Sequence, residues 1–260
     1  MLLVLKLVLV PALVVAVTLA TRWWGPRVGG WLTGMPIVAG PALFFLALEQ
    51  GDAFASEAAR ATLVALIGVA AFGVVYAWVA LGSAWPVSLL AGWAVFGALT
   101  PLLHAVAWPP AVALGGALGS FAVARRWLPP PRGPAIQSAS PTWDLPLRVT
   151  GALAIVLTVT HLAERLGPSL SGALTPFPVA VAVVLAFAHA RDGTPMVSHL
   201  LRAFIPAMWA FALFCYVLAV TMVPLGHTGA FAVAVVVQLV AQGAVFWIDG
   251  RASVPAATAR

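Results

Sequence analysis

The sequence predicts an all-α, polytopic membrane protein with about nine transmembrane helices. Three observations predict this fold class: the composition, the long apolar stretches and an internal repeat. Hydrophobic residues make up 63% of the 260 residues and charged residues only 8%, whereas roughly 25% of a typical soluble domain is charged. Several apolar stretches reach the roughly 20 residues that a helix needs to cross the hydrocarbon of a bilayer. This composition is typical of a protein whose surroundings are mostly lipid.

Charged residues and Pro or Gly breaks divide the apolar sequence into predicted spans. The nine spans cover residues 2–21, 28–48, 59–82, 85–104, 106–124, 146–163, 169–190, 200–223 and 226–248. The stretch from residue 83 to residue 127 is too long for one crossing, because its first 42 residues would form a helix of about 63 Å. We therefore predict two spans there, hinged at residues 107–110.

The basic residues are unevenly divided between the two predicted sides of the membrane. One side carries Arg22, Arg27, Arg125, Arg126, Arg132, Arg148, Arg191, Arg202, Arg251 and Arg260. The other side carries Lys6, Arg60 and Arg165. Because cytoplasmic loops hold an excess of Lys and Arg, the arginine-rich side is predicted to face the cytoplasm. We expect a multi-pass protein of the cell (inner) membrane with its N-terminus outside and its C-terminus inside.

An offset of 142 residues aligns two segments of the chain without a gap. From residue 25 to residue 61, 12 of 37 positions are identical, and the shared residues include Gly, Pro, Ser and Arg as well as apolar residues. The identical pairs are Gly25/Gly167, Pro26/Pro168, Gly30/Gly172, Leu32/Leu174, Thr33/Thr175, Pro36/Pro178, Leu43/Leu185, Phe45/Phe187, Gly51/Gly193, Ser56/Ser198, Arg60/Arg202 and Ala61/Ala203. Such self-similarity indicates a duplicated unit.

The offset carries spans one to four onto spans six to nine and leaves span five unpaired. An odd number of spans between two copies turns the second copy over, so the repeats are predicted to have inverted topology. The predicted organisation is a first membrane repeat (1–104), an unpaired linking helix (105–127), a cytoplasmic linker (128–145), a second membrane repeat (146–250) and a cytoplasmic tail (251–260).

The repeated motif Gly-Pro-x-x-x-Gly-x-Leu-Thr-x-x-Pro predicts a substrate-binding site. It ends at Pro36 in the first copy and at Pro178 in the second. Each proline frees a backbone carbonyl about one turn earlier, near Leu32 and near its counterpart in the second copy. Thr33 and Thr175 could bond those groups or face a substrate, or each could bond its own helix at a simple packing kink. Two broken helices related by a repeat are a typical feature of carrier sites.

Polar side chains in other spans extend this prediction. Gln238 and Gln242 lie one helical turn apart in the last span and share a face. The offset places Thr100 at the position of Gln242 in the first copy. The two amides are either substrate contacts or hydrogen bonds that join helices, and the sequence favours neither.

His161 and Glu164, at the outer end of span six, form a candidate pair for proton coupling, because imidazole titrates near neutral pH. The alternative is a solvated helix end. Arg60 and Arg202 each open a span, which indicates anchoring at the interface or attraction to a substrate or to lipid phosphate.

The sequence argues against several other functions. It contains none of the examined metal-protease, nucleophile-elbow or phosphate-loop motifs, so neither an enzyme nor a bound cofactor or metal is expected. The net charge of +6 is spread over span ends and is not a basic nucleic-acid surface, so we expect no nucleic-acid partner. Cys215 lies alone in an apolar run, which excludes a disulfide within the chain.

The prediction for function is a secondary-active transporter, a monomer or a homodimer, with membrane lipid as its surroundings. No cation is evident within the spans, so the expected substrate is a small neutral, zwitterionic or amphipathic organic solute. A flippase for a lipid or a lipid-linked molecule is the main alternative. A channel and a non-transporting membrane partner are further alternatives.

Overall fold

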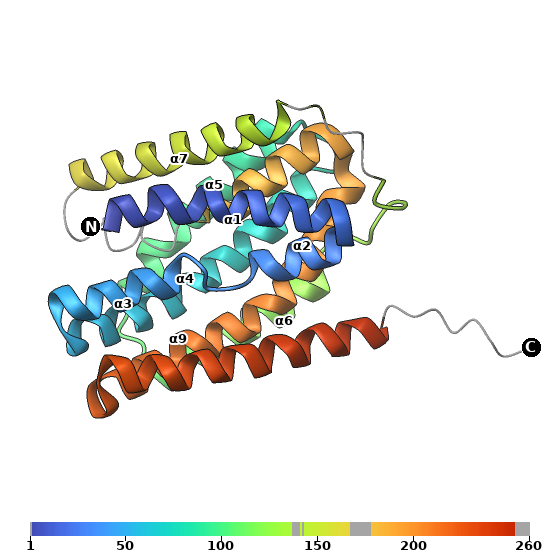
Figure 1. The fold of residues 1–260 in the computed structure, drawn as a ribbon. Helices are drawn as coiled ribbons and strands as arrows, with labels where there is room; N and C mark the ends of the chain where they lie inside the picture. Colours follow the sequence, from blue (N-terminus) through green and yellow to red (C-terminus); the bar gives the residue numbers. More distant parts are fainter. Residues whose placement is uncertain (1, 137–140, 142, 167–177, 253–260) are drawn as a thin grey trace, which may run out of the picture.

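The computed structural model describes residues 2–136, 141, 143–166 and 178–252. Within these residues the chain is helical and contains no strand. The helices are α1 (Leu2–Trp24), α2 (Pro26–Thr33), α3 (Ala39–Gln50), α4 (Asp52–Val79), α5 (Trp85–His104), α6 (Pro110–Trp127), α7 (Asp144–Leu166) and α9 (Val179–Ala252). They pack as one bundle, and α9 ends at the opposite end of the bundle from the start of α1 (Figure 1).

The described residues form eight helices instead of the nine predicted spans. The three predicted spans after residue 168 correspond to the single element α9, which has 74 residues. Its backbone leaves the helical region at Gly193, with φ 76°, and at Gly226, with φ 68°. Because glycine adopts positive φ without a steric penalty, α9 bends sharply at both positions and folds back on itself (Figure 1).

Predicted span 28–48 is two helices and not one. α2 has 8 residues and α3 has 12, which correspond to about 12 Å and 18 Å at the rise of an α-helix. Neither helix alone crosses about 30 Å of hydrocarbon. The interruption lies at residues 34–38, which include Pro36.

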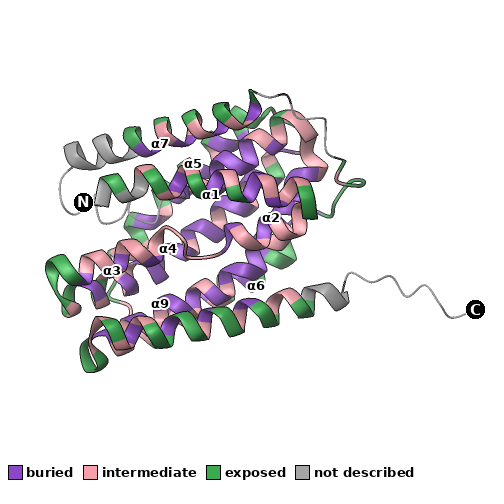
Figure 2. Cartoon of the chain, viewed as in Figure 1, coloured by how far each residue is buried: buried purple, intermediate pink, exposed green. Residues whose placement is uncertain are grey.

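Among the described residues, four helices are long and apolar enough to cross a membrane: α1, α4, α5 and α9. The outer surface of the last part of α9 supports a lipid environment, because many of its large apolar side chains are exposed (Figure 2). They are Val233, Val235, Val236, Leu239, Val240, Trp247 and Ile248. Large exposed apolar patches are uncommon on soluble monomers, so this surface is compatible with a membrane protein.

The core of the bundle lies between α4 and α9. Phe72 and Tyr76 of α4 are fully buried. A Cβ atom on Gly73 would lie 3.3 Å from Cδ2 of Leu201, so the two helices pack closely where α4 carries no side chain. α6 also packs against both of these helices.

Several helix boundaries recur at an offset of 142 residues. α1 and α7 both have 23 residues, and the offset carries Leu2–Trp24 onto Asp144–Leu166. Gly51, which precedes α4, and Gly193 both have positive φ. α1 and α7 pack against each other and run in opposite directions (Figure 1).

Candidate functional site

The break between α2 and α3 is built from local backbone hydrogen bonds. The N–H of Gly34 lies within bonding distance of the carbonyl oxygens of Gly30 and Trp31, at 3.3 and 3.2 Å. The N–H of Met35 donates to the carbonyl of Leu32 at 3.1 Å. The carbonyl of Leu32, which the sequence predicts to be left free by Pro36, is therefore paired within the same turn.

Thr33 is buried, and its hydroxyl donates to the carbonyl of Gly29 at 2.7 Å. It thus bonds its own helix, as the packing-kink alternative requires, and does not bond the carbonyl of Leu32. Its hydroxyl oxygen keeps lone pairs that can accept a further hydrogen bond.

The two glutamines of α9 lie against α2. Nε2 of Gln242 donates to the carbonyl of Trp31 at 3.0 Å, and Nε1 of Trp31 donates to the backbone carbonyl of Gln242 at 3.0 Å. Nε2 of Gln238 donates to Oε1 of Gln242 at 3.1 Å. Gln242 is therefore an interhelical link. Gln238 is 4% exposed, and its Oε1 has no hydrogen-bond partner among the described residues.

The same interface continues toward the end of α9. The guanidinium of Arg27 lies 4.4 Å from the ring centroid of Phe246 and donates to the Phe246 carbonyl. The rings of Trp31 and Phe246 meet edge to face at 5.3 Å. These contacts hold the first turns of α2 against the last part of α9.

α2 also touches the middle part of α9 almost backbone to backbone. A Cβ atom on Gly30 would lie 2.4 Å from the carbonyl oxygen of Leu200, and one on Gly34 would lie 2.4 Å from Cβ of Ala207. These distances are too short for real Cβ contacts, so only glycine fits at either position. The broken helix is thus held between two parts of α9.

The remaining predicted site residues are elsewhere or undescribed. Thr100 lies in α5, and its buried hydroxyl has no partner among the described residues. A Cβ atom on Gly68 of α4 would lie 3.0 Å from that hydroxyl, so Thr100 packs against α4. Pro178 is buried and its carbonyl accepts the N–H of Ala182 at 3.0 Å. Thr175 lies outside the described residues.

The predicted proton-coupling pair stays a prediction. His161 and Glu164 are within α7, but their side chains lie outside the described part of the structure. Another histidine contact was not anticipated from the sequence: Nδ1 of His189 in α9 lies 3.5 Å from the hydroxyl of the buried Tyr76 in α4.

Sequence reasoning also missed a cluster of ionic groups around Asp144. The carboxylate of Asp144 is fully buried and contacts Arg22 of α1 at 2.5 Å, Arg148 of α7 at 2.8 Å and Arg191 of α9 at 2.6 Å. The only sequence signal is the four-residue spacing of Asp144 and Arg148, which places both on one helix face. In the sequence, the three arginines indicate only which side of the membrane is cytoplasmic.

The arginines set the charge state of this carboxyl group. Burial by itself raises the pKa of Asp144, but hydrogen bonds and charges from Arg148 and Arg191 outweigh burial and hold the pKa below its ordinary value. Asp144 therefore stays ionised near neutral pH and joins α1, α7 and α9 at the arginine-rich end of the bundle.

A pocket of about 660 Å³ lies elsewhere on the molecule. Its lining residues are Trp78, Arg126, Trp127, Leu128, Pro129, Pro130 and Arg202. None of them belongs to the predicted substrate site.

Comparison of the chain with models of protein families, with characterised proteins and with solved structures finds no match.

Proposed function

We propose that this protein is a secondary-active transporter built from two inverted repeats of four spans each, with α6 as the unpaired fifth span. The observation that carries the proposal is the interrupted helix α2–α3, held between two parts of α9 and linked to it by buried amides. Discontinuous helices at the interface between repeats are typical of carrier binding sites.

The contacts of two arginines support the inverted repeat. Arg60 and its counterpart at the offset of 142 residues, Arg202, bond opposite ends of α6: Nη1 of Arg60 donates to the Trp108 carbonyl, and Nη2 of Arg202 donates to the Leu128 and Pro129 carbonyls. A helix on a two-fold axis in the membrane plane would be contacted in this way. The recurring boundaries of α1 and α7 add to this support.

Nine spans follow if α2 and α3 count as one interrupted crossing and α9 counts as three. The three parts of α9 are separated at Gly193 and Gly226. In this topology the protein lies in the cell (inner) membrane with its arginine-rich end on the cytoplasmic side. The N-terminus lies outside and the C-terminus lies inside.

The substrate class follows from the chemistry of the interface. Oxygen Oε1 of Gln238 is a buried acceptor without a partner among the described residues, and such a group is costly unless something binds it. A substrate with an N–H or O–H donor would satisfy it. No charged side chain is among the hydrogen-bond partners of the two amides in the described residues, which favours a small neutral, zwitterionic or amphipathic organic solute.

The Asp144 cluster would close the cytoplasmic side of the proposed transporter in the described state. Arg22 belongs to the first repeat, whereas Arg148 and Arg191 belong to the second. Their shared carboxylate holds the two repeats together at the arginine-rich end, so the described state is proposed to be closed on the cytoplasmic side. Opening on that side would separate Arg22 from Asp144.

Uptake into proteoliposomes tests the proposal. The purified protein is reconstituted and offered a panel of radiolabelled neutral and zwitterionic solutes, with protein-free vesicles as the control. We expect saturable uptake of at least one class, lost in Gln238→Leu and retained in Gln50→Leu, since Gln50 is exposed at the end of α3. Movement of a labelled lipid between leaflets without solute uptake would favour the flippase, and equal uptake by both variants would contradict the proposed site.

A further inference from the structure

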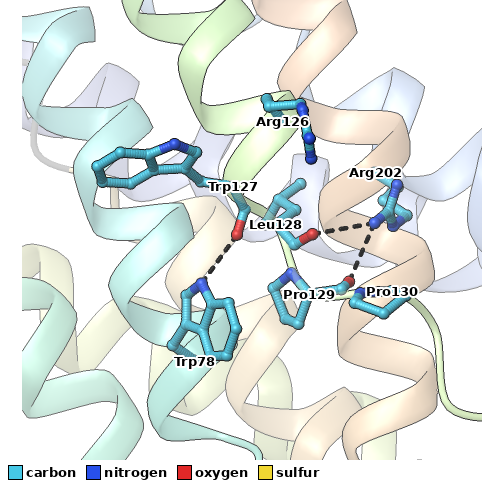
Figure 3. A pocket seen from close by; sticks show the side chains of 7 residues that line it. All are labelled: Trp78, Arg126, Trp127, Leu128, Pro129, Pro130 and Arg202. Atoms are coloured by element: carbon cyan, nitrogen blue, oxygen red, sulfur yellow. Dashed lines mark hydrogen bonds between the residues drawn. The ribbon is translucent and has the colours of Figure 1, made fainter.

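The pocket at the arginine-rich end has the chemistry of an anion site. Arg126 reaches it from α6 and Arg202 from α9, and none of the seven lining residues is acidic (Figure 3). Nη2 of Arg202 donates to the carbonyls of Leu128 and Pro129 at 3.0 and 3.1 Å. Its Nε–H is buried and has no hydrogen-bond partner among the described residues. An unpaired buried donor of this kind is energetically costly, and the two guanidinium groups give the pocket a positive charge.

The other wall of the pocket is aromatic and exposed. Nε1 of Trp78 donates to the carbonyl of Trp127 at 2.8 Å, which fixes the Trp78 ring beside the pocket (Figure 3). Both tryptophans are more than half exposed, at 53% and 65%. Tryptophan is enriched at the level of lipid headgroups, so an exposed pair of tryptophans is the wall expected of a headgroup site.

We propose that this pocket binds the phosphate of an anionic phospholipid headgroup. Arginine binds phosphate through charge-assisted hydrogen bonds in a planar geometry, and the two arginines lie at the end of the bundle where most arginines are placed. Basic pockets between membrane helices on the cytoplasmic side are typical lipid-headgroup sites. The volume of about 660 Å³ is sufficient for a headgroup. The soluble alternative with the same chemistry is a free phosphate ion.

A bound headgroup would contact both halves of the protein. Trp78 belongs to α4 in the first half and Arg202 to α9 in the second, while Trp127 ends α6 and Pro130 lies in the segment that follows it. The lipid would therefore stabilise the junction of the two halves with α6. This inference concerns a resident lipid and does not depend on the transported solute.

Native mass spectrometry of the full-length protein, with added phosphatidylglycerol or phosphatidylcholine, tests the proposal. We expect one retained phosphatidylglycerol and weaker retention of phosphatidylcholine. Arg126→Gln should weaken retention of phosphatidylglycerol by about fivefold, the effect of one basic group near a lipid surface, while Arg126→Lys keeps the charge and most of the binding. Arg132→Gln removes the same charge from an exposed position outside the pocket and should leave retention unchanged.

Two outcomes would overturn the inference. The first is equal retention of phosphatidylglycerol by Arg126→Gln and Arg132→Gln, which would show that the pocket does not bind the headgroup. The second is binding of inorganic phosphate that is lost in Arg126→Gln, while the parent retains phosphatidylglycerol no better than phosphatidylcholine, which would identify a soluble phosphate as the ligand. Because Arg126 is exposed, its replacement should not prevent folding.

Discussion

Arg60 and Arg202 bond the two opposite ends of the same helix, α6. Nη1 of Arg60 lies 3.2 Å from the carbonyl oxygen of Trp108, just before α6, and Nη2 of Arg202 lies 3.0 Å from that of Leu128, just after it. The two arginines are 142 residues apart, which is the offset of the sequence repeat. Contacts at opposite ends of α6 are what the proposed inverted repeat predicts for this pair of side chains.

The first prediction concerns these arginines. Arg60→Gln and Arg202→Gln each remove a charged donor to a backbone carbonyl. We expect each variant to lower the free energy of unfolding by about 1 kcal/mol. This value is small for a hydrogen bond from a charged group, because both sites are partly exposed. Since the sites lie at opposite ends of α6, the double variant should lose the sum of the two effects. Thermal unfolding in detergent measures this, with Arg132→Gln as the control. A loss in the double variant no larger than in one single variant would contradict independent anchoring.

The second prediction separates the two glutamines. Gln242→Leu leaves the carbonyl of Trp31 and Nε2 of Gln238 unpaired, so it should destabilise the protein by about 1–3 kcal/mol. Gln238→Leu breaks only the bond to Oε1 of Gln242, since Oε1 of Gln238 has no partner among the described residues, and it should affect stability less while abolishing uptake. Thermal unfolding and proteoliposome uptake on the same preparations distinguish the two effects. A larger stability loss in Gln238→Leu than in Gln242→Leu would refute this assignment of roles.

The third prediction concerns the contact of α2 with α9. Gly30→Ala places a methyl group 2.4 Å from the carbonyl oxygen of Leu200, and such overpacking typically costs about 1–3 kcal/mol. Gly40→Ala is the matched control, because its Cβ would make an ordinary contact of 3.5 Å with Phe214. The folding yield and the midpoint temperature of thermal unfolding should fall for Gly30→Ala and not for Gly40→Ala. Equal stability of both variants would show that α2 does not lie so close to α9.

The fourth prediction concerns pH. The pKa of Asp144 is lower in the folded protein than its ordinary value, so the folded state binds its proton less readily than the unfolded state. The stability that Asp144 contributes is therefore present above its ordinary pKa of about 4 and is lost as pH falls through the lower folded value. Unfolding measured from neutral to acidic pH should show this loss in the parent.

Asp144→Asn tests the same cluster at neutral pH. It leaves three arginines without their shared carboxylate, and breaking a buried ion pair in this way costs about 3–5 kcal/mol. The variant should be less stable than the parent at neutral pH, and the difference should shrink at acidic pH, where the parent carboxyl is protonated. A constant difference across the pH range would show that ionisation of Asp144 does not contribute.

Local features of the sequence determined much of the fold. Composition and apolar length indicate a helical membrane protein, because backbone N–H and C=O groups in lipid must be hydrogen-bonded within the protein and a helix pairs them within one segment. The interruption at Pro36 follows from the missing N–H of proline, and the bend at Gly193 follows from glycine's access to positive φ. The division of predicted span 28–48 into two short helices was not determined in this way, because proline fixes where a helix is interrupted but not whether a second helix begins directly after it.

Only the tertiary structure decided which side chains meet. Gln242 contacts Trp31 across 211 residues of sequence, and Asp144 gathers arginines from three helices. Periodicity within one helix specifies the face on which a side chain lies but not the neighbouring helix that the face contacts. The sequence by itself therefore determined the helical class, the long apolar helices and the interruption of the second predicted span. The tertiary structure decided that Thr33 bonds its own helix and that Gln242 links two helices. It also decided that, of the two amides, only Gln238 has an oxygen without a hydrogen-bond partner among the described residues. These outcomes depend on distances between segments that are far apart in the sequence.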